Sequence, residues 1–398
     1  MRIVLTIDFS PWSPYSGGAQ RSTDRLARAL AARSHRVDVV YTRPPWERFA
    51  LPQDLPYAVH WAALPALRSH RAAPLRPLSG LAVRRVVARL LDPAAPTIVH
   101  ANGEEGAFLA ALRHQRRLAL IASPRHPGYL PAFDAGWPRG LSQVGVALVG
   151  AKYLAQGAVA RAADRVCPPS AYAGELCVRA FGVDPVRVEA IHNGVDPAFA
   201  AARRREGAAD GHVVFFGRLE EDKGVLDLVD AWERLPGPLP RLVLVGRGAL
   251  EGPLRARLAA LPADRPAELR GWTSSAALAD LLAGAALCVL PSRRESFGNA
   301  IAEALAAGAP VLSCRCASIP ELVVHGERGW LVPPAAPQAL ADAIARLLAD
   351  APLRERLAAA GAAWAREHLT WDDAARRFES VYERALAVAS RAWPRGQH

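Results

Sequence analysis

The sequence lacks any run of apolar residues long enough to cross a bilayer. A transmembrane helix needs about 20 such residues, and the longest candidate, residues 141–160, is interrupted by Gln143, Lys152 and Gln156. The opening residues, MRIVLTIDF, are typical of a short strand and show no secretory signal. We therefore expect a cytoplasmic protein that is either soluble or peripheral on the inner face of the membrane.

Cysteine is scarce, and its spacing indicates neither a zinc site nor a disulfide framework. The five cysteines include no paired Cys-x-x-Cys motif and stand at positions 167, 177, 288, 314 and 316. This pattern fits a reducing compartment, so we expect the cysteines to be structural thiols.

Acidic residues are too few in the first half to balance the basic ones. Residues 1–200 hold 24 Lys and Arg against 14 Asp and Glu, an excess of 10, and the whole chain has a net charge of +11. The basic half therefore predicts an anionic partner, which could be a phospholipid leaflet, a phosphate-bearing acceptor or a nucleic acid. The absence of a recognised nucleic-acid-binding motif argues against the last.

One basic segment of the first half has a helical pattern. In LAVRRVVARLLD, residues 81–92, apolar residues recur at helical spacing, with Arg84, Arg85 and Arg89 elsewhere on the wheel. Such a helix could rest on an anionic membrane. It could equally cover a sheet and expose its arginines to water.

Strands alternate with helices along the whole chain, which indicates α/β structure with parallel sheets covered on both faces. Apolar periodicity gives way to proline, glycine and charge between residues 193 and 211. We predict two Rossmann-like doubly wound domains, 1–195 and 196–370, facing a central cleft, with a final helix, 371–390, that returns to the first domain. The pattern also predicts helices near 104–114 and 145–163. Ligands in such sheets bind at the carboxyl ends of strands.

Two cations follow the first strand of the second half. In FFGRLEEDKG, residues 215–224, Arg218 and Lys223 lie where a strand passes into a helix. Free backbone amides at a helix start favour an anion, and two fixed positive charges beside them suit a diphosphate. The alternative is a pair of solvated surface charges.

Two acids eight positions apart bracket another helix start in ESFGNAIAE, residues 295–303. The amides of Phe297, Gly298 and Asn299 would be unpaired donors able to hold phosphate oxygens. Glu295 would lie just outside the helix, and Glu303 lies deeper, where it could accept hydrogen bonds from a ribose diol. The alternative is that both are ordinary acids near a helix start.

The first half offers weaker candidates. Gly17 and Gly18, in YSGGAQ, could admit a phosphate or form a plain turn. His126, in ASPRHPGY, follows a strand and could contact a sugar or the reacting centre, although a lone histidine is more often structural. His100 and Asn102 have the same kind of location.

Taken together, these motifs resemble those of the family 4 retaining glycosyltransferases, which have the GT-B architecture and belong to the group 1 enzymes with an E-x7-E motif. GRLEEDKG is similar to the family's Gly-Arg-Leu…Lys-Gly motif, and ESFGNAIAE to its E-x7-E motif. The segments at 163–199, HGERGWLVPP and WDDAARRFESVYERAL also match. The resemblance covers nearly the whole chain, most strongly residues 164–335.

The resemblance implies a nucleotide-diphosphate sugar as co-substrate and neither a metal nor another cofactor. Arg218 and Lys223 would neutralise the diphosphate, while Glu295 would hold sugar hydroxyls and Glu303 the ribose. The remaining donor-binding residues implied are Gly17, Gly18, Ser296, Phe297, Gly298 and Asn299.

Two positions depart from the family pattern. His126 falls near the family's first-domain histidine, but Arg125 could occupy that place instead. The family's glycine pair before Ile-Pro-Glu is replaced by Ala317 and Ser318, which would change contacts to the sugar or the acceptor.

The resemblance leaves the acceptor open. A lipid-linked or cell-envelope saccharide suits the basic first half, and a small-molecule natural product is the alternative. A non-catalytic partner subunit that only binds nucleotide sugar is a third possibility. The presence of Arg218, Lys223, Glu295 and Glu303 argues against it.

Overall fold

The computed structural model describes residues 1–13, 16–48, 50–64, 76–114, 117–125, 143–208 and 211–390. The chain divides into two compact units. The first comprises Met1–Gly194 and the segment that begins at Trp371, and the second comprises Val195–Thr370. The sequence placed this boundary after residue 195.

The first unit is built on a parallel sheet in which six described strands follow the order β3-β2-β1-β4-β5-β6. The order reverses between β1 and β4, as it does in a doubly wound sheet. The strands are β1 (Arg2–Ile7), β2 (Arg36–Arg43), β3 (Ala58–Ala63), β4 (Thr97–Ala101), β5 (Leu118–Ala122) and β6 (Arg165–Val166).

Helices cover both faces of this sheet, and β1 shows why. Ile3, Leu5 and Ile7 are buried in the same cluster as α1 and α14, whereas Val4 is buried in the cluster of α2 and α4. Alternate residues of a strand point to opposite faces, so an unbroken apolar run requires cover on both. The described helices are α1 (Gly18–Ala32), α2 (Arg76–Leu90), α4 (Gln143–Ala162), α5 (Ala171–Phe181) and α14 (Trp371–Ser390).

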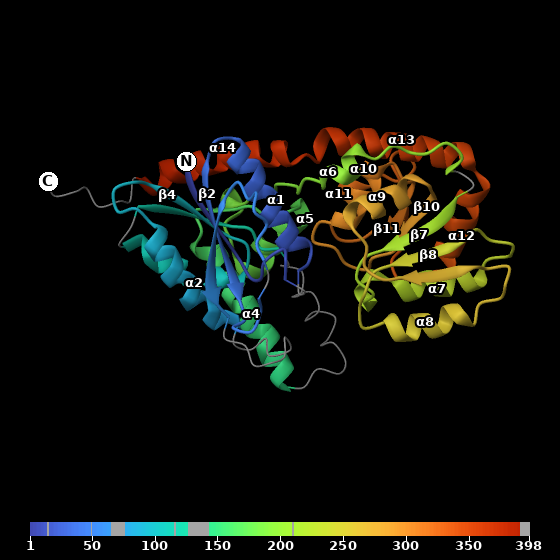
Figure 1. Cartoon of the computed structure of the whole chain (residues 1–398), viewed down its shortest axis with the longest axis horizontal. Coiled ribbons are helices and arrows are strands. Elements are labelled where there is room, and N and C mark those ends of the chain that lie inside the picture. The colour runs from blue at the N-terminus through green and yellow to red at the C-terminus, as the bar shows by residue number, and fades with distance from the viewer. Residues whose placement is uncertain are drawn as a thin grey trace. The chain divides into compact units, whose positions relative to one another are not determined.

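The last helix, α14, packs on the first unit, where Figure 1 shows it in red close to α1. His100 of β4 binds Tyr382 of α14, with 2.8 Å between Nδ1 and the phenol oxygen. Its Nε2 lies 2.7 Å from Ser123 Oγ, which donates to the Cys167 carbonyl. Because Ser123 has one proton to donate, His100 Nε2 must donate to it and Tyr382 must donate to Nδ1.

The ring of His100 is therefore neutral, and burial lowers its pKa to about 3. A fully buried ring with both nitrogens bonded to protein has no capacity left for a sugar. Of the two possibilities that the sequence left open, the structure supports the structural role for His100.

The second unit repeats the plan. Its six described strands form a parallel sheet in the order β12-β11-β10-β7-β8-β9, which reverses between β7 and β10. Each described unit is thus a doubly wound α/β domain, as predicted. The strands are β7 (His212–Phe216), β8 (Leu242–Val245), β9 (Ala267–Arg270), β10 (Ala285–Leu290), β11 (Val311–Cys314) and β12 (Trp330–Val332).

Helices again lie on both sides of the sheet (Figure 1). Among them, α7 packs against α12, and α10 packs against α13, α9 and α6. The bounds are α6 (Pro197–Ala201), α7 (Val225–Arg234), α8 (Glu251–Ala259), α9 (Ser275–Ala283), α10 (Asn299–Ala307), α11 (Ile319–Leu322), α12 (Pro337–Ala349) and α13 (Ala351–His368).

One expected helix takes a different form. The segment near 104–114 folds as two 3-10 turns, η2 (Glu104–Gly106) and η3 (Leu109–His114). The helix expected near 145–163 is α4. Among the described residues, no helix combines the length and the apolar character needed to span a membrane.

Candidate active site

The two motifs of the second half follow neighbouring strands. Residues 217–224 come after β7 and residues 291–298 come after β10, and these two strands pair where the strand order reverses. The carboxyl ends of parallel strands meet at one edge of a sheet, and a reversal of order parts the loops there. The candidate site therefore lies at the topological switch point of the second unit.

At this edge the two motifs touch through an ion pair. Lys223 Nζ lies 2.7 Å from Glu295 Oε1, and the side chains are 18% and 13% exposed. Lys223 comes from η7 (Glu221–Lys223), which precedes α7. Ser292 Oγ donates to the same carboxylate oxygen at 2.8 Å. Lys223 and Glu295, which the sequence analysis gave separate roles, thus meet in one half-buried cluster.

A glycine sets how closely the two loops approach. Gly224 has φ +65°, and a Cβ built on it would lie 2.0 Å from the Pro291 carbonyl oxygen. Only glycine meets both requirements without strain. The close approach brings Lys223, the preceding residue, up to the turn that carries Glu295.

Further bonds fasten the same loops. The Arg293 amide donates to the Asp222 carbonyl at 2.9 Å. The Arg293 guanidinium makes two bonds to the Asp227 carboxylate, at 2.6 and 2.8 Å. A bidentate pair of this kind fixes orientation as well as distance. Sequence reasoning missed Arg293 and Asp227, which lie two residues before the second motif and three residues after the first.

Arg218 lies on the same loop with a different partner. Its Nη2 is 2.8 Å from Asp222 Oδ2, and its side chain is 56% exposed. An exposed pair of this kind contributes little to stability. The guanidinium can therefore change partner at small cost, as a cation that receives a ligand must.

The helix start between the two acids is α10, which begins at Asn299. Gly298 precedes it with φ +98°, a left-handed conformation that a residue with a side chain rarely adopts. The Phe297 ring is buried in the core, so only its backbone is placed to serve a ligand. Ser296 stands in the same turn. Glu303 is half-buried on the second turn of α10, where the sequence placed it.

Gly17 and Gly18 belong to the first unit. Helix α1 begins at Gly18, at the carboxyl end of β1. Gln20 accepts a bond from the Gly17 amide at 2.9 Å and donates to the Asp8 carbonyl at 2.8 Å. The backbone of Gly17 is extended, and a Cβ there would meet nothing closer than 3.6 Å. In the described structure, neither the backbone conformation nor the packing requires a glycine at position 17. A glycine there would instead allow a ligand to approach the backbone closely.

His126 lies outside the described residues, and its neighbour Arg125 is buried. Arg125 donates to Asn102 Oδ1 through Nε and Nη2, at 3.1 and 2.6 Å, and to Asn193 Oδ1 through Nη1 at 2.9 Å. Burial lowers the pKa of Arg125 to about 10, so it stays charged at neutral pH. The arginine thus joins the ends of β4 and β5 to the residue that precedes Gly194.

A cluster of buried acids in the first unit escaped sequence reasoning. Asp8, Glu104 and Glu105 each place one carboxylate oxygen within 4.8 Å of the others. Lys152 Nζ lies 3.4 Å from Glu104, and Gln156 donates to Glu104 at 3.1 Å. Burial and the neighbouring carboxyls raise the pKa of Glu105 well above its usual range. Burial beside two other acids thus disfavours the charged form of Glu105.

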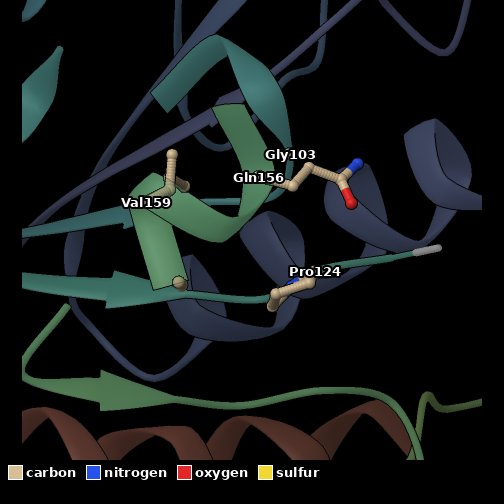
Figure 2. Close-up of a pocket in the computed structure, with 6 residues that line it drawn as sticks. Gly103, Pro124, Gln156 and Val159 are labelled. Carbon is tan, nitrogen blue, oxygen red and sulfur yellow. The ribbon is translucent and has the colours of Figure 1, made fainter. Parts of the chain in front are cut away.

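Gln156, which donates to Glu104, also lines a small pocket, which is drawn in Figure 2. Gln156 and Val159 of α4 line it together with Gly103 and with Pro124, which follows β5. Figure 2 shows these side chains around the carboxyl end of β5. None of the residues predicted to bind a donor lines this pocket, so we assign it to packing between α4 and the sheet.

Family comparisons cover most of the chain. Residues 16–199 match the family described as Glycosyltransferase Family 4. Residues 210–350 match the family described as Glycosyl transferases group 1. The two matches contain every residue predicted to bind a donor.

Curated relatives agree with these matches. A D-inositol 3-phosphate glycosyltransferase of Jonesia denitrificans is 35% identical over 241 residues, which are 53% of this chain and 54% of that protein. A glycogen synthase of Mycobacterium tuberculosis is 32% identical, over 59% of this chain and 58% of that protein. The chain thus aligns with a little over half of these relatives. A D-inositol 3-phosphate glycosyltransferase of Acidothermus cellulolyticus is 29% identical over 94% of this chain and 86% of that protein.

Solved structures share the fold. The sucrose-phosphate synthase of Thermosynechococcus elongatus superposes with a TM-score of 0.80 at 22% identity, covering 98% of this chain and 100% of that one. Anabaena HepE in complex with UDP-glucose gives a TM-score of 0.72 at 20% identity, with 96% and 100% covered. The GT-B architecture expected from the sequence is thereby confirmed.

Gly224→Ala should disrupt the candidate site and destabilise the second unit. The added Cβ would collide with the Pro291 carbonyl in a backbone conformation that alanine tolerates poorly, which should cost about 2 kcal/mol or more. Thermal unfolding would show this as a lower Tm. The matched control is Gly252→Ala on α8, where a Cβ meets nothing within 4 Å and φ is not positive. A Gly224 variant as stable as the control would contradict the role given to this close approach.

Proposed function

Since the chain belongs to the family 4, group 1 glycosyltransferases, we propose that it transfers a sugar from a nucleotide-diphosphate sugar to a saccharide acceptor with retention of anomeric configuration. The observation that carries the proposal is the contact between Lys223 and Glu295 at the switch point of the second sheet. It places a cation for phosphate and an acid for hydroxyl groups side by side, next to the helix start at Asn299.

The donor is assigned by the chemistry of this edge. Arg218 and Lys223 carry the positive charge, and the N-terminus of α10 adds backbone amides and the positive end of the helix dipole, which together suit a diphosphate. Glu295 has a second carboxylate oxygen that can accept from sugar hydroxyls, and Glu303 is assigned the ribose. HepE, which shares the fold, has been solved with UDP and with UDP-glucose, which supports a donor of this class.

Catalysis follows from where charge develops. As the glycosidic bond breaks, negative charge grows on the leaving diphosphate and positive charge on the sugar. Lys223 and the amides of Gly298 and Asn299 are held in place before the reaction, so they stabilise the leaving group with little reorganisation, and the exposed Arg218 adds a second cation. With this charge supplied by the protein, no metal ion is required for the step.

Retention requires the acceptor to attack the face that the diphosphate leaves. In the proposed step the acceptor hydroxyl bonds to the anomeric carbon, and a leaving phosphate oxygen takes its proton. Gly17 and Gly18 are assigned contacts to the diphosphate from the first unit. His126 is assigned a place near the reacting sugar.

For the acceptor we propose a lipid-linked or cell-envelope saccharide, because the first unit offers a surface for an anionic membrane. Leu78 and Leu81 of α2 are 48% and 39% exposed, and Phe108 is 36% exposed. The Phe108 ring lies close to Gly80, so the three apolar side chains belong to one region. Arg85 and Arg89 of the same helix are exposed, which gives the region positive charge. An apolar group beside exposed arginines is the combination that binds an anionic leaflet.

A thermal-shift screen tests the donor assignment. UDP-, GDP-, ADP- and dTDP-sugars are added in turn, because a ligand that binds only the folded state raises the Tm. At least one should do so, and release of its nucleoside diphosphate with an added acceptor would distinguish an enzyme from a binding subunit. If none shifts the Tm, the proposed function is wrong.

Lys223→Ala should reduce turnover by a factor on the order of 10² or more, by analogy with the loss of one preorganised donor to a developing charge. The control is Arg255→Ala, which also removes a cation paired with a glutamate but lies on the surface of α8. Steady-state kinetics with the donor found in the screen would measure both. Turnover within a few-fold of wild type in Lys223→Ala would reject the assignment.

Reversing the charge of Arg84, Arg85 and Arg89 to glutamate should weaken binding to phosphatidylcholine vesicles that contain phosphatidylglycerol, because each Lys or Arg near an anionic surface contributes about 1 kcal/mol. Vesicle sedimentation measures the bound fraction. The control makes the same change in net charge at Arg234, Arg241 and Arg255, all exposed in the second unit. Equal binding by both triple variants and wild type would show that α2 only covers the sheet.

A further inference from the structure

The loop after β11 departs from the family pattern and reaches the candidate site. It runs from Arg315 to Ser318 and leads into α11. Ala317 has φ +51°, a left-handed conformation that is costly for alanine. This kink lies between Cys316 and Ser318, whose side chains both reach the turn that carries Glu295.

The contacts hold that turn at both ends. Ser318 Oγ donates to the Glu295 carbonyl at 3.1 Å, and the Ser318 amide lies 3.5 Å from the same oxygen. Cys316 Sγ donates to the Ser292 carbonyl at 3.2 Å. Ser318 is fully buried and Ser292 is 4% exposed, so water has limited access to these bonds.

The turn that these bonds hold also carries the Glu295 carboxylate. Ser292 Oγ and Lys223 Nζ both bond Glu295 Oε1. With its carbonyl held by Ser318 and one carboxylate oxygen held by two groups, Glu295 is fixed through both main chain and side chain. A glycine pair, which the family pattern has at 317 and 318, could not supply the hydroxyl.

We propose that Ser318, supported by Cys316, is a positioning residue that aims the Glu295 carboxylate at the hydroxyls of the donor sugar and so sets which sugars bind. The inference rests on the proposed function, because it assumes that Glu295 contacts the sugar. Its effect should be larger on the sugar than on the nucleoside diphosphate, because Ser318 makes no bond to Arg218 or Lys223 in the described structure.

The test separates sugar binding from nucleotide binding. Calorimetry gives the Kd of the nucleotide sugar chosen by the thermal-shift screen, for example UDP-glucose, and of its nucleoside diphosphate, UDP. In Ser318→Ala the affinity for the nucleotide sugar should fall about fivefold relative to that for the diphosphate, the equivalent of one net hydrogen bond. Ser318→Thr, which keeps the hydroxyl, should restore the wild-type ratio.

Ser313→Ala is the matched control. Ser313 is equally buried, lies on β11, and donates to the Leu290 carbonyl at 2.6 Å, so its loss removes the same kind of bond without touching the Glu295 turn. If Ser318→Ala leaves the ratio unchanged, or Ser313→Ala changes it as much, the positioning role is wrong although donor binding by the wild type is confirmed. Ser318→Gly, the residue of the family pattern, supplies a second variant should alanine prevent folding.

Hydrogen exchange tests, without any ligand, whether Ser318 holds the turn at residues 292–296 in place. Amides of residues 292–296 should exchange faster in Ser318→Ala and Ser318→Gly than in wild type or Ser313→Ala. Unchanged exchange rates would contradict the positioning role of Ser318 even if the protein proves to be a transferase. If no nucleotide sugar binds wild type, the proposed function fails, and the positioning role fails with it.

Discussion

The candidate site depends on the approach of two loops at the reversal of strand order in the second sheet. Gly224 allows the backbone to come within contact of the Pro291 carbonyl, and the ion pair between Lys223 and Glu295 forms because of it. The bidentate contact of Arg293 with Asp227 secures the same junction. Because both side chains of this ion pair are mostly buried, the cost of removing their charges from water offsets much of their attraction, so the pair adds little to stability. The geometry of the pair is instead set by the backbone. Charges that are positioned before the reaction are what preorganised catalysis requires.

The sequence predicted the doubly wound fold well because central parallel strands are buried on both faces and read as continuous apolar runs. Edge strands give a weaker signal. β3 and β9 border their sheets and are half-buried over much of their length, so neither is a continuous apolar run. The segment 104–114 was read as one helix because its residues are good helix formers. Two 3-10 turns form there instead, and Glu105 bonds back to the end of β4 through the Asn102 amide.

The contact between the two motifs could be anticipated from strand ends alone, because each motif is local in sequence and the sheet brings them together. Contacts between distant residues could not. His100 and Tyr382 are 282 positions apart, and the sequence around each residue gives no indication of its partner. The same holds for Ser318, whose departure from the family pattern was visible in the sequence but whose bond to the Glu295 carbonyl was not. Motifs identify the residues that meet a ligand, whereas the residues that hold them in place emerge only from tertiary structure.

Charge is arranged differently in the two units, and this bears on which one takes the phosphates. In the first, Asp8, Glu104 and Glu105 are buried together, and Arg125 is bonded to asparagine side chains. In the second, Arg218 and Lys223 stand at the edge of the sheet on a loop that leads into a helix. A diphosphate gains most where cations and a helix N-terminus coincide and loses where buried acids dominate. On this ground we propose that the nucleotide binds the second unit and that the basic excess of the first half serves the acceptor.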